Sequence, residues 1–298
     1  MDPRGGTEIL WSNFCKYVNK SHRDKVNIIL SDCRHELLRA DIPNILWQHV
    51  DTDQAVARGL ADPAFVRSLE KIVFVSNWQR QKYIAQFNLP PEKCTVLLNA
   101  VETVEPIEKP KSDKLKLIYT STPWRGLEVL VEVFKILGRS DIQLDVYSST
   151  VIYGAKFMPR AYEWLFDRCR QTQGINYRGY AANKAVVKAA QASHILAYPS
   201  IFAETSCLAA IEAGAAGCKI VTTDLGALPE TCGVWADYTN YNTQDLVIRY
   251  AELLNSCIEN YWSNYPALIE QHRWFNDRYS WLNRKVEWEN LIDGVING

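Results

Sequence analysis

The sequence predicts an α/β protein of two domains, each built on a parallel sheet covered by helices. Short runs of β-branched and apolar residues alternate with longer segments of helical periodicity, which is the pattern of strand–helix–strand units. The length of 298 residues suits about two domains of ordinary size. Residues 104–114 contain two prolines and a run of charges, as linkers do, so we expect domains at 1–105 and 106–274.

The elements follow in order along the chain. In the first domain we expect strands at 26–30, 45–47, 72–75 and 95–98, with helices at 7–18 and 78–87. In the second we expect strands at 115–119, 142–147, 175–177, 195–198 and 220–221, with helices at 127–137, 161–169, 184–192 and 206–215. From Gln244 the pattern is helical only, and Trp281 and Trp288, seven residues apart, share one face of the last helix.

Charge and composition exclude several classes of protein. Lys and Arg number 33 against 34 Asp and Glu, so the basic excess typical of a nucleic-acid binder is missing. No apolar run approaches the ~20 residues of a membrane span. The eight cysteines show no metal spacing and predict buried thiols in a reducing cytoplasm. A basic cluster at residues 16–25 is expected to be a solvated helix end, with contact at a membrane surface left open.

The segment around residues 199–214 carries the strongest chemical signal. Pro199 and Ser200 end a buried strand, and a helix is expected to follow. Ligands bind at this carboxyl edge of open α/β sheets, and a helix N-terminus there suits phosphate. Glu204 and Glu212 are eight residues apart, which we interpret as two carboxylates on one side, the first for sugar hydroxyls and the second for a ribose diol.

With Cys207 and Leu208 at the helix start, this segment resembles the E-x7-E signature of retaining glycosyltransferases of the GT-B fold, in family four. The resemblance implies two Rossmann-like domains, the first for the acceptor and the second for a nucleotide-sugar. It implies that a C-terminal helix, about 275–298, packs back on the first domain. It also implies transfer with retention by front-face substitution, in which the departing phosphate oxygen takes the acceptor proton.

Other segments extend the resemblance. Arg125, before Gly126, stands where the family has a Lys or Arg on the diphosphate, whereas Ser121 and Thr122 occupy the stretch of a second family Arg. Residues 175–180 resemble the turn that receives the base, and residues 224–230 resemble a following loop. The donor-binding residues so implied are Gly5, Gly6, Thr122, Arg125, Tyr180, Glu204, Ser206, Cys207, Leu208 and Glu212.

The N-terminal half resembles the family less fully. Residues 4–8 resemble its Gly-Gly loop, and His49, at the end of a strand, resembles its active-site histidine. The catalytic residues implied are therefore Glu204, Arg125 and His49. The family's first strand should precede Gly5, but only four residues do, so the first domain is expected to be short and to lack that strand, through a late start or a rearranged sheet.

Alternatives stay open at this point. Asp51-Thr-Asp53 mimics a D-x-D metal site, although we expect no metal and no cofactor, because Arg125 and a helix N-terminus can supply the positive charge. The expected function is transfer of a sugar from a UDP- or GDP-sugar to a glycan, lipid-linked or other hydroxyl acceptor. The alternatives are a non-catalytic nucleotide-sugar-binding module and a phage-type glycosyltransferase acting on modified DNA bases.

Overall fold

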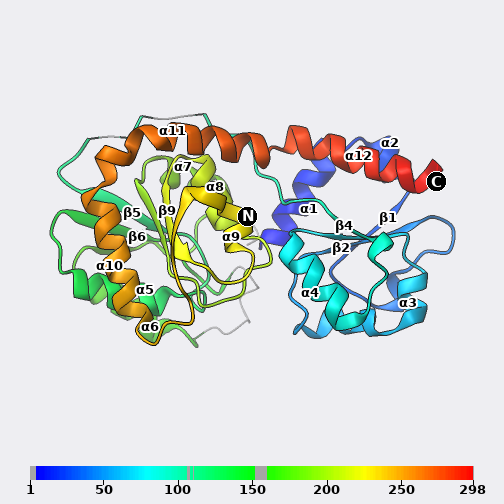
Figure 1. Cartoon of the computed structure of the whole chain (residues 1–298), viewed down its shortest axis with the longest axis horizontal. Helices are drawn as coiled ribbons and strands as arrows, with labels where there is room; N and C mark the ends of the chain where they lie inside the picture. The colour runs from blue at the N-terminus through cyan, green and yellow to red at the C-terminus, as the bar shows by residue number, and fades with distance from the viewer. Residues whose placement is uncertain (1–4, 106–107, 110, 152–159, 298) are drawn as a thin grey trace. The chain divides into compact units, whose positions relative to one another are not determined.

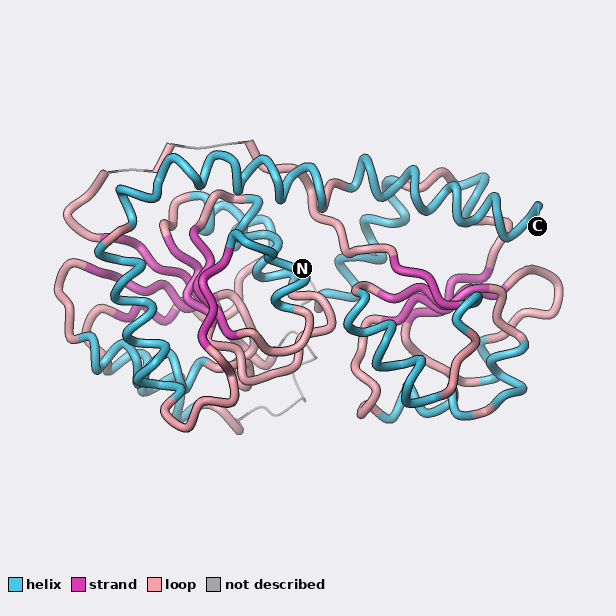
Figure 2. The backbone as a smooth tube through the Cα atoms, viewed as in Figure 1, coloured by secondary structure: helices cyan, strands magenta, loops and turns pink. Residues whose placement is uncertain are grey.

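The computed structural model describes residues 5–105, 108–109, 111–151 and 160–297 of the chain, which forms two compact units. The N-unit comprises Gly6–Glu102, Glu204–Ser206 and Arg278–Gly298. The C-unit comprises Thr103–Ala203 and Cys207–Asp277, together with Gly5. Each unit consists of a parallel sheet between layers of helices (Figure 2).

Within the described residues, the N-unit sheet has four parallel strands in the order β1-β2-β3-β4, and the first strand along the chain is β1. The strands are β1 (Asn27–Leu30), β2 (Asn44–Gln48), β3 (Lys71–Phe74) and β4 (Cys94–Val96). The helices are α1 (Gly6–Tyr17), α2 (Lys20–Arg23), α3 (Pro63–Arg67), α4 (Asn77–Phe87) and α12 (Trp281–Asn297). Helices α3 and α4 cover one face of this sheet and α1 and α12 the other (Figure 1), so every residue of β2 is buried.

Aromatic side chains join α1, β2 and α12 within the N-unit. The rings of Phe14, Trp47 and Trp288 meet with centroids 4.9–5.7 Å apart in tilted and edge-to-face arrangements. Trp281 stacks on Tyr17 with centroids 5.7 Å apart. Each such pair contributes about 0.5–1.5 kcal/mol beyond the burial of its area. The last helix is thus part of the core of the N-unit, and both of its spaced tryptophans are buried.

The C-unit sheet is parallel, with six strands in the order β10-β9-β8-β5-β6-β7 among the described residues. Its strands are β5 (Leu115–Tyr119), β6 (Ile142–Val146), β7 (Ile175–Tyr177), β8 (Ile195–Tyr198), β9 (Lys219–Thr223) and β10 (Ala236–Thr239). Its helices are α5 (Leu127–Leu137), α6 (Glu163–Gln171), α7 (Asn183–Gln191), α8 (Leu208–Ala215), α9 (Leu228–Cys232), α10 (Leu246–Glu259) and α11 (Tyr261–Arg278). Helices α5, α6 and α10 lie on one face, and α7, α8 and α9 lie on the other (Figure 1).

The segment expected to link the two domains is not solvated throughout, because Lys109 within it is buried. Its side chain is 3% exposed, and its ammonium donates to the carbonyls of Ala190, Gln191 and Ala216 at 2.8–3.2 Å. These carbonyls lie at the C-terminal ends of α7 and α8, where a cation satisfies orphan acceptors and opposes the helix dipole. Burial lowers the pKa of Lys109. The segment is therefore anchored to the C-unit.

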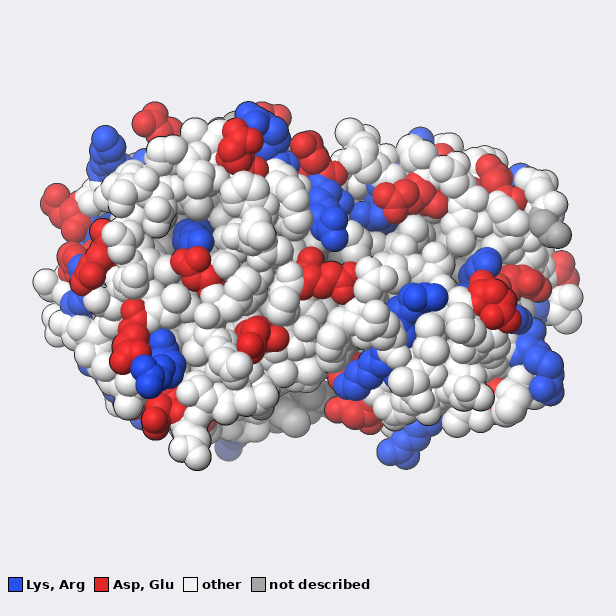
Figure 3. Space-filling view, in the orientation of Figure 1, with Lys and Arg blue, Asp and Glu red and all other residues white. Residues whose placement is uncertain are grey.

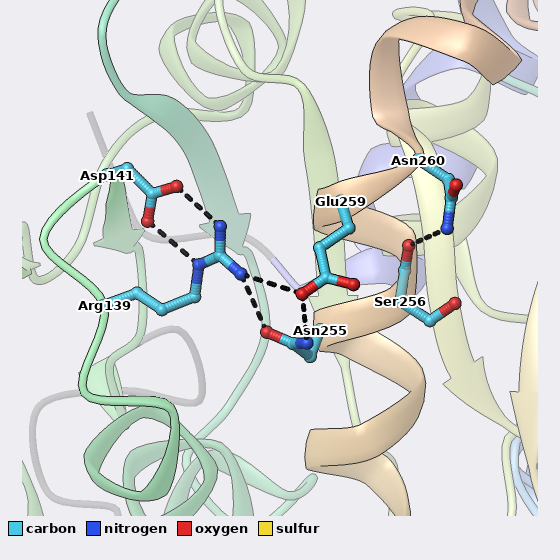
Figure 4. A network of polar contacts seen from close by, with 6 residues as sticks. All are labelled: Arg139, Asp141, Asn255, Ser256, Glu259 and Asn260. Carbon is cyan, nitrogen blue, oxygen red and sulfur yellow. Dashed lines mark hydrogen bonds and ion pairs between the residues drawn. The ribbon is translucent and has the colours of Figure 1, made fainter.

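A second polar network in the C-unit joins the turn after α5 to α10 (Figure 4). The Arg139 guanidinium donates two hydrogen bonds to Asp141, at 2.6 and 2.9 Å, and one to Asn255 at 2.9 Å. It also lies 3.5 Å from Glu259. The fork of Arg139 lowers the pKa of Asp141. A bidentate pair of this kind fixes geometry more than an ordinary surface ion pair does.

Charges of both signs are interspersed over the face drawn in Figure 3. Members of the basic cluster at residues 16–25 have acidic neighbours in the N-unit: Lys16 pairs with Glu102, and His22 lies 3.4 Å from Asp293. No helix in the described part of the chain has the length and apolar character needed to cross a membrane. All eight cysteines are free thiols, and all but Cys15 are buried.

Candidate functional site

Two loops pack directly together at the carboxyl edge of the C-unit sheet. One follows β5 and leads through Arg125 into α5, and the other follows the neighbouring strand β8. Gly126 lies between them with φ +101°, and a Cβ placed there would lie 2.0 Å from the Pro199 carbonyl oxygen. Only glycine allows this backbone conformation together with so close an approach. The contact therefore fixes the start of α5 against the end of β8.

The Arg125 side chain lies over an aromatic ring at this edge. Its guanidinium is 4.5 Å from the centroid of the Phe202 ring, in a cation–π arrangement. Its backbone N–H donates to the Thr122 carbonyl at 3.2 Å, and the Tyr119 hydroxyl donates to the same carbonyl at 2.7 Å. The loop thus holds a partly buried cation in a defined place. The sequence indicated Arg125 and Thr122 but not Phe202, whose position two residues beyond Ser200 was the available signal.

Helices α5 and α8 begin at this edge without side-chain caps. The N-cap residue of α5 is Gly126, which has no side chain, and that of α8 is Cys207, whose side chain makes no capping hydrogen bond. The N–H groups of a first helical turn have no carbonyl partner within the helix, and the positive end of the dipole adds to their attraction for anions. Cys207 is 1% exposed, and Leu208 is the first residue of α8. Both helix starts have the character of phosphate sites.

Glu212, in the second turn of α8, is paired with an asparagine from α7. The Asn183 amide donates to Glu212 Oε1 at 2.6 Å. The Glu212 side chain is partly buried, and desolvation raises its pKa to about 7, while the Asn183 hydrogen bond opposes that rise. The carboxylate and amide together offer the acceptors and donors that a diol needs. Sequence analysis missed Asn183, although its place just after the expected base-binding turn could have indicated it.

The structure corrects the geometry expected of the E-x7-E segment. Helix α8 begins at Leu208, two residues later than expected, so Glu204 lies in the preceding loop and helical spacing does not relate it to Glu212. The argument that eight residues put both carboxylates on one helical face is therefore wrong. Residues 204–206 also belong to the N-unit, whereas Glu212 belongs to the C-unit. Glu204 is 3% exposed, and Ser206 is partly buried.

His49 follows β2 at the carboxyl edge of the N-unit sheet. Its backbone N–H donates to Ser31 Oγ at 3.0 Å, and its ring lies 4.5 Å from that of Trp47. Ser31 has φ +59°, a left-handed conformation that is strained for serine. Desolvation lowers the pKa of His49 to about 3, so its imidazole is neutral at physiological pH. Its Nε2 is buried with no partner in the described part of the chain.

The remaining predicted residues lie in different surroundings. Gly6 begins α1 in the N-unit, the buried Gly5 precedes it, and Arg4 lies outside the described residues. Thr205, beside Glu204 in the N-unit, donates through Oγ1 to the His49 carbonyl at 2.7 Å. Tyr180 follows β7 in the C-unit and is 39% exposed. The predicted site residues are thus divided between the two units.

The first aspartate of the D-x-D segment is paired with a lysine side chain. Asp51 is 6% exposed, and its carboxylate receives a 2.6 Å hydrogen bond from the Lys82 ammonium. It also accepts from the backbone N–H of Thr52 at 2.7 Å. Within the described ranges, no group of three or more His, Cys, Asp or Glu side chains is arranged to hold a metal ion. The Lys82 charge at Asp51 opposes the binding of a second cation there.

Comparisons with known proteins agree with this architecture. Residues 114–257 match the family profile described as glycosyl transferases group 1, and no curated protein sequence matches the chain. HepE of Anabaena, solved with UDP-glucose, matches with a TM-score of 0.67 at 14% identity, over 85% of this chain and 72% of HepE. A glycosyltransferase from Rickettsia africae matches with a TM-score of 0.69 at 16% identity, over 99% and 83% of the two chains.

Sucrose-phosphate synthase of Thermosynechococcus elongatus matches with a TM-score of 0.68 at 12% identity, over 87% of this chain and 69% of the synthase. At such identities the likeness concerns the fold, which is the GT-B fold of two units with parallel sheets. The family match lies within the C-unit, from the first residues before β5 to α10. The chain thus has the GT-B fold, and residues 114–257 match the profile of glycosyl transferases group 1.

Proposed function

We propose that this protein is a retaining glycosyltransferase that moves a sugar from a UDP- or GDP-sugar to a hydroxyl of a glycan, lipid-linked or other acceptor. The observation that carries the proposal is the carboxyl edge of the C-unit sheet. There, Arg125 on Phe202, the uncapped starts of α5 and α8, and the Glu212–Asn183 pair lie within the segment that matches a glycosyltransferase family. The complexes of HepE with UDP-glucose support a nucleotide-sugar as donor.

In the proposed reaction, negative charge grows on the diphosphate as the bond from sugar to phosphate breaks. Arg125 and the first turn of α8 would stabilise that charge, because fixed donors need no reorganisation at the moment of reaction. One such group is worth about 10²–10³-fold in rate when deleted. Glu212 would accept hydrogen bonds from the two ribose hydroxyls. Most of the catalysis is then positioning and stabilisation of the leaving group.

We propose front-face substitution, with the acceptor proton passing to the departing phosphate oxygen. Glu204 would orient the donor sugar. His49 would contact donor sugar or acceptor as a neutral hydrogen-bonding group, because its pKa of about 3 keeps it uncharged. No metal enters the proposal, since the positive charge comes from Arg125 and the helix starts.

A screen of UDP- and GDP-sugars for hydrolysis and for thermal stabilisation tests the proposal. We expect one donor to raise the melting temperature and to be hydrolysed slowly, and Arg125→Ala to abolish most of that hydrolysis. Arg170→Ala is the matched control, because Arg170 also lies on an aromatic ring of the C-unit, 4.7 Å from the centroid of Tyr177. No hydrolysis and no stabilisation by any nucleotide-sugar would refute the proposed function.

A further inference from the structure

Two buried hydroxyl groups lie at the ends of neighbouring strands in the C-unit. Thr122 is three residues beyond β5 and is 3% exposed, and Ser148 is two residues beyond β6 and is 2% exposed. Strands β5 and β6 are paired in parallel up to Tyr119 and Val146, so both hydroxyls lie at the carboxyl edge of the sheet. The Tyr147 N–H continues the pairing with a 2.8 Å hydrogen bond to the Tyr119 carbonyl.

The main chain of each loop is held by a tyrosine hydroxyl, whereas the side-chain hydroxyls of Thr122 and Ser148 lack a partner among the described residues. The Tyr119 hydroxyl donates to the Thr122 carbonyl at 2.7 Å, and the Tyr177 hydroxyl donates to the Ser148 carbonyl at 3.0 Å. Thr122 Oγ1 and Ser148 Oγ have no partner in the part of the chain that the structure describes. A buried hydroxyl without a partner destabilises a fold. Two of them at one functional edge indicate that something else completes their hydrogen bonds.

The order of the strands determines which strand ends a bound nucleotide-sugar must cross. The sheet runs β8-β5-β6-β7, with the start of α8 beyond β8 and Tyr180 beyond β7. Neighbouring strands lie about 4.8 Å apart, so β8 and β7 are separated by roughly 14 Å. A donor with its phosphates at Arg125 and α8 and its base near Tyr180 must therefore cross the ends of β5 and β6. Thr122 and Ser148 lie at those two strand ends.

We propose that the hydroxyls of Thr122 and Ser148 hydrogen-bond the nucleoside diphosphate of the donor, which makes Ser148 a binding residue outside the motifs found in the sequence. This inference rests on the proposed function and adds a residue to its donor site. The inference predicts opposite effects on ligand affinity and on stability, because the same hydroxyls that stabilise the complex destabilise the free protein. Removing one should weaken ligand binding without lowering the stability of the unliganded chain.

The test compares Ser148→Ala and Thr122→Val with two control variants. Ser193 and Thr222 are equally buried in the C-unit, but their hydroxyls donate to the carbonyls of Ala189 at 2.8 Å and Tyr198 at 2.7 Å. Titration calorimetry with UDP and GDP gives the affinity, and thermal unfolding without ligand gives the stability. Loss of one hydrogen bond should weaken nucleotide binding by about three- to tenfold in each test variant.

The melting temperature of the unliganded test variants should equal that of the wild type or exceed it by up to about 3 °C. The controls Ser193→Ala and Thr222→Val should show the reverse, a lower melting temperature with wild-type affinity. Wild-type affinity in Ser148→Ala, or a drop in its melting temperature like that of the controls, overturns this inference and leaves the proposed function standing. A wild-type chain that binds neither nucleotide and cleaves no nucleotide-sugar refutes both.

Discussion

Replacing Gly126 by alanine tests whether the contact between the arginine loop and the end of β8 organises the site. The residue has φ +101°, and a Cβ there would lie 2.0 Å from the Pro199 carbonyl oxygen and 2.8 Å from its carbon. An ordinary contact needs more than 3 Å, so the backbone of one loop must move by roughly 1 Å. Strained backbone and overpacking each cost about 1–3 kcal/mol. We therefore expect Gly126→Ala to lower the free energy of unfolding by about 3 kcal/mol.

The matched control lies at the other end of the same helix. Gly138 caps the C-terminus of α5 with φ +55°, and no atom outside its neighbourhood lies closer than 3.8 Å to an added Cβ. Gly138→Ala therefore carries only the backbone strain, about 1 kcal/mol. Because Arg125 directly precedes Gly126, the test variant should also weaken UDP or GDP binding, and the control should not.

Guanidinium denaturation followed by circular dichroism measures the two stabilities, and calorimetry measures nucleotide binding. The informative quantity is the difference between the variants, since both change glycine to alanine at a positive φ on α5. Equal losses of stability, with nucleotide affinity unchanged in both, would refute the view that the Gly126–Pro199 contact builds the site.

Four further predictions concern Lys109, Glu212, the pair Glu204 and Arg125, and the removal of metal ions. Lys109→Met should lower the free energy of unfolding by about 3 kcal/mol, since two buried carbonyls and one partly buried carbonyl lose their shared donor, and chemical denaturation checks this. The pKa of Glu212, about 7, lies above the usual 4.5 of a glutamate, so the folded state binds this proton more tightly. The contribution of Glu212 to stability therefore falls as pH rises from about 4.5 to 7. Its carboxylate form should also bind ribose better, so UDP or GDP affinity should rise between pH 6 and 8; a profile of the same slope in Glu212→Gln would contradict the assignment. Glu204→Ala should spare nucleoside diphosphate binding and lower turnover. Arg125→Ala should lower kcat by about 10²–10³-fold and change KM less, and steady-state kinetics measures both variants. A near-normal kcat in Arg125→Ala excludes the leaving-group role. Transfer should survive EDTA, and a complete loss that Mn²⁺ restores would bring Asp51 back as a metal ligand.

The local pattern of the sequence determined most of the strands and helices. Strands β5, β7 and β8 have the predicted bounds, because each is a short run led by β-branched, aromatic or other apolar residues. Strand β10 was missed, since Ala236–Thr239 includes the charged Asp237 and two of its four residues are only partly buried.

Only the tertiary structure decided the surroundings of the site residues. The spacing of Glu204 and Glu212 was interpreted with helical geometry, but α8 begins at Leu208, two residues later than expected, and such a boundary depends on packing rather than on spacing. Lys109 belongs to the charged segment that predicted a linker, and it is buried because the carbonyls that accept its hydrogen bonds come from two helices more than eighty residues away in the chain. Sequence determines which groups a chain carries and which face they occupy. The partners of a side chain, and hence the pKa of His49 and the unsatisfied hydroxyl of Ser148, come from contacts between distant segments that no local pattern encodes.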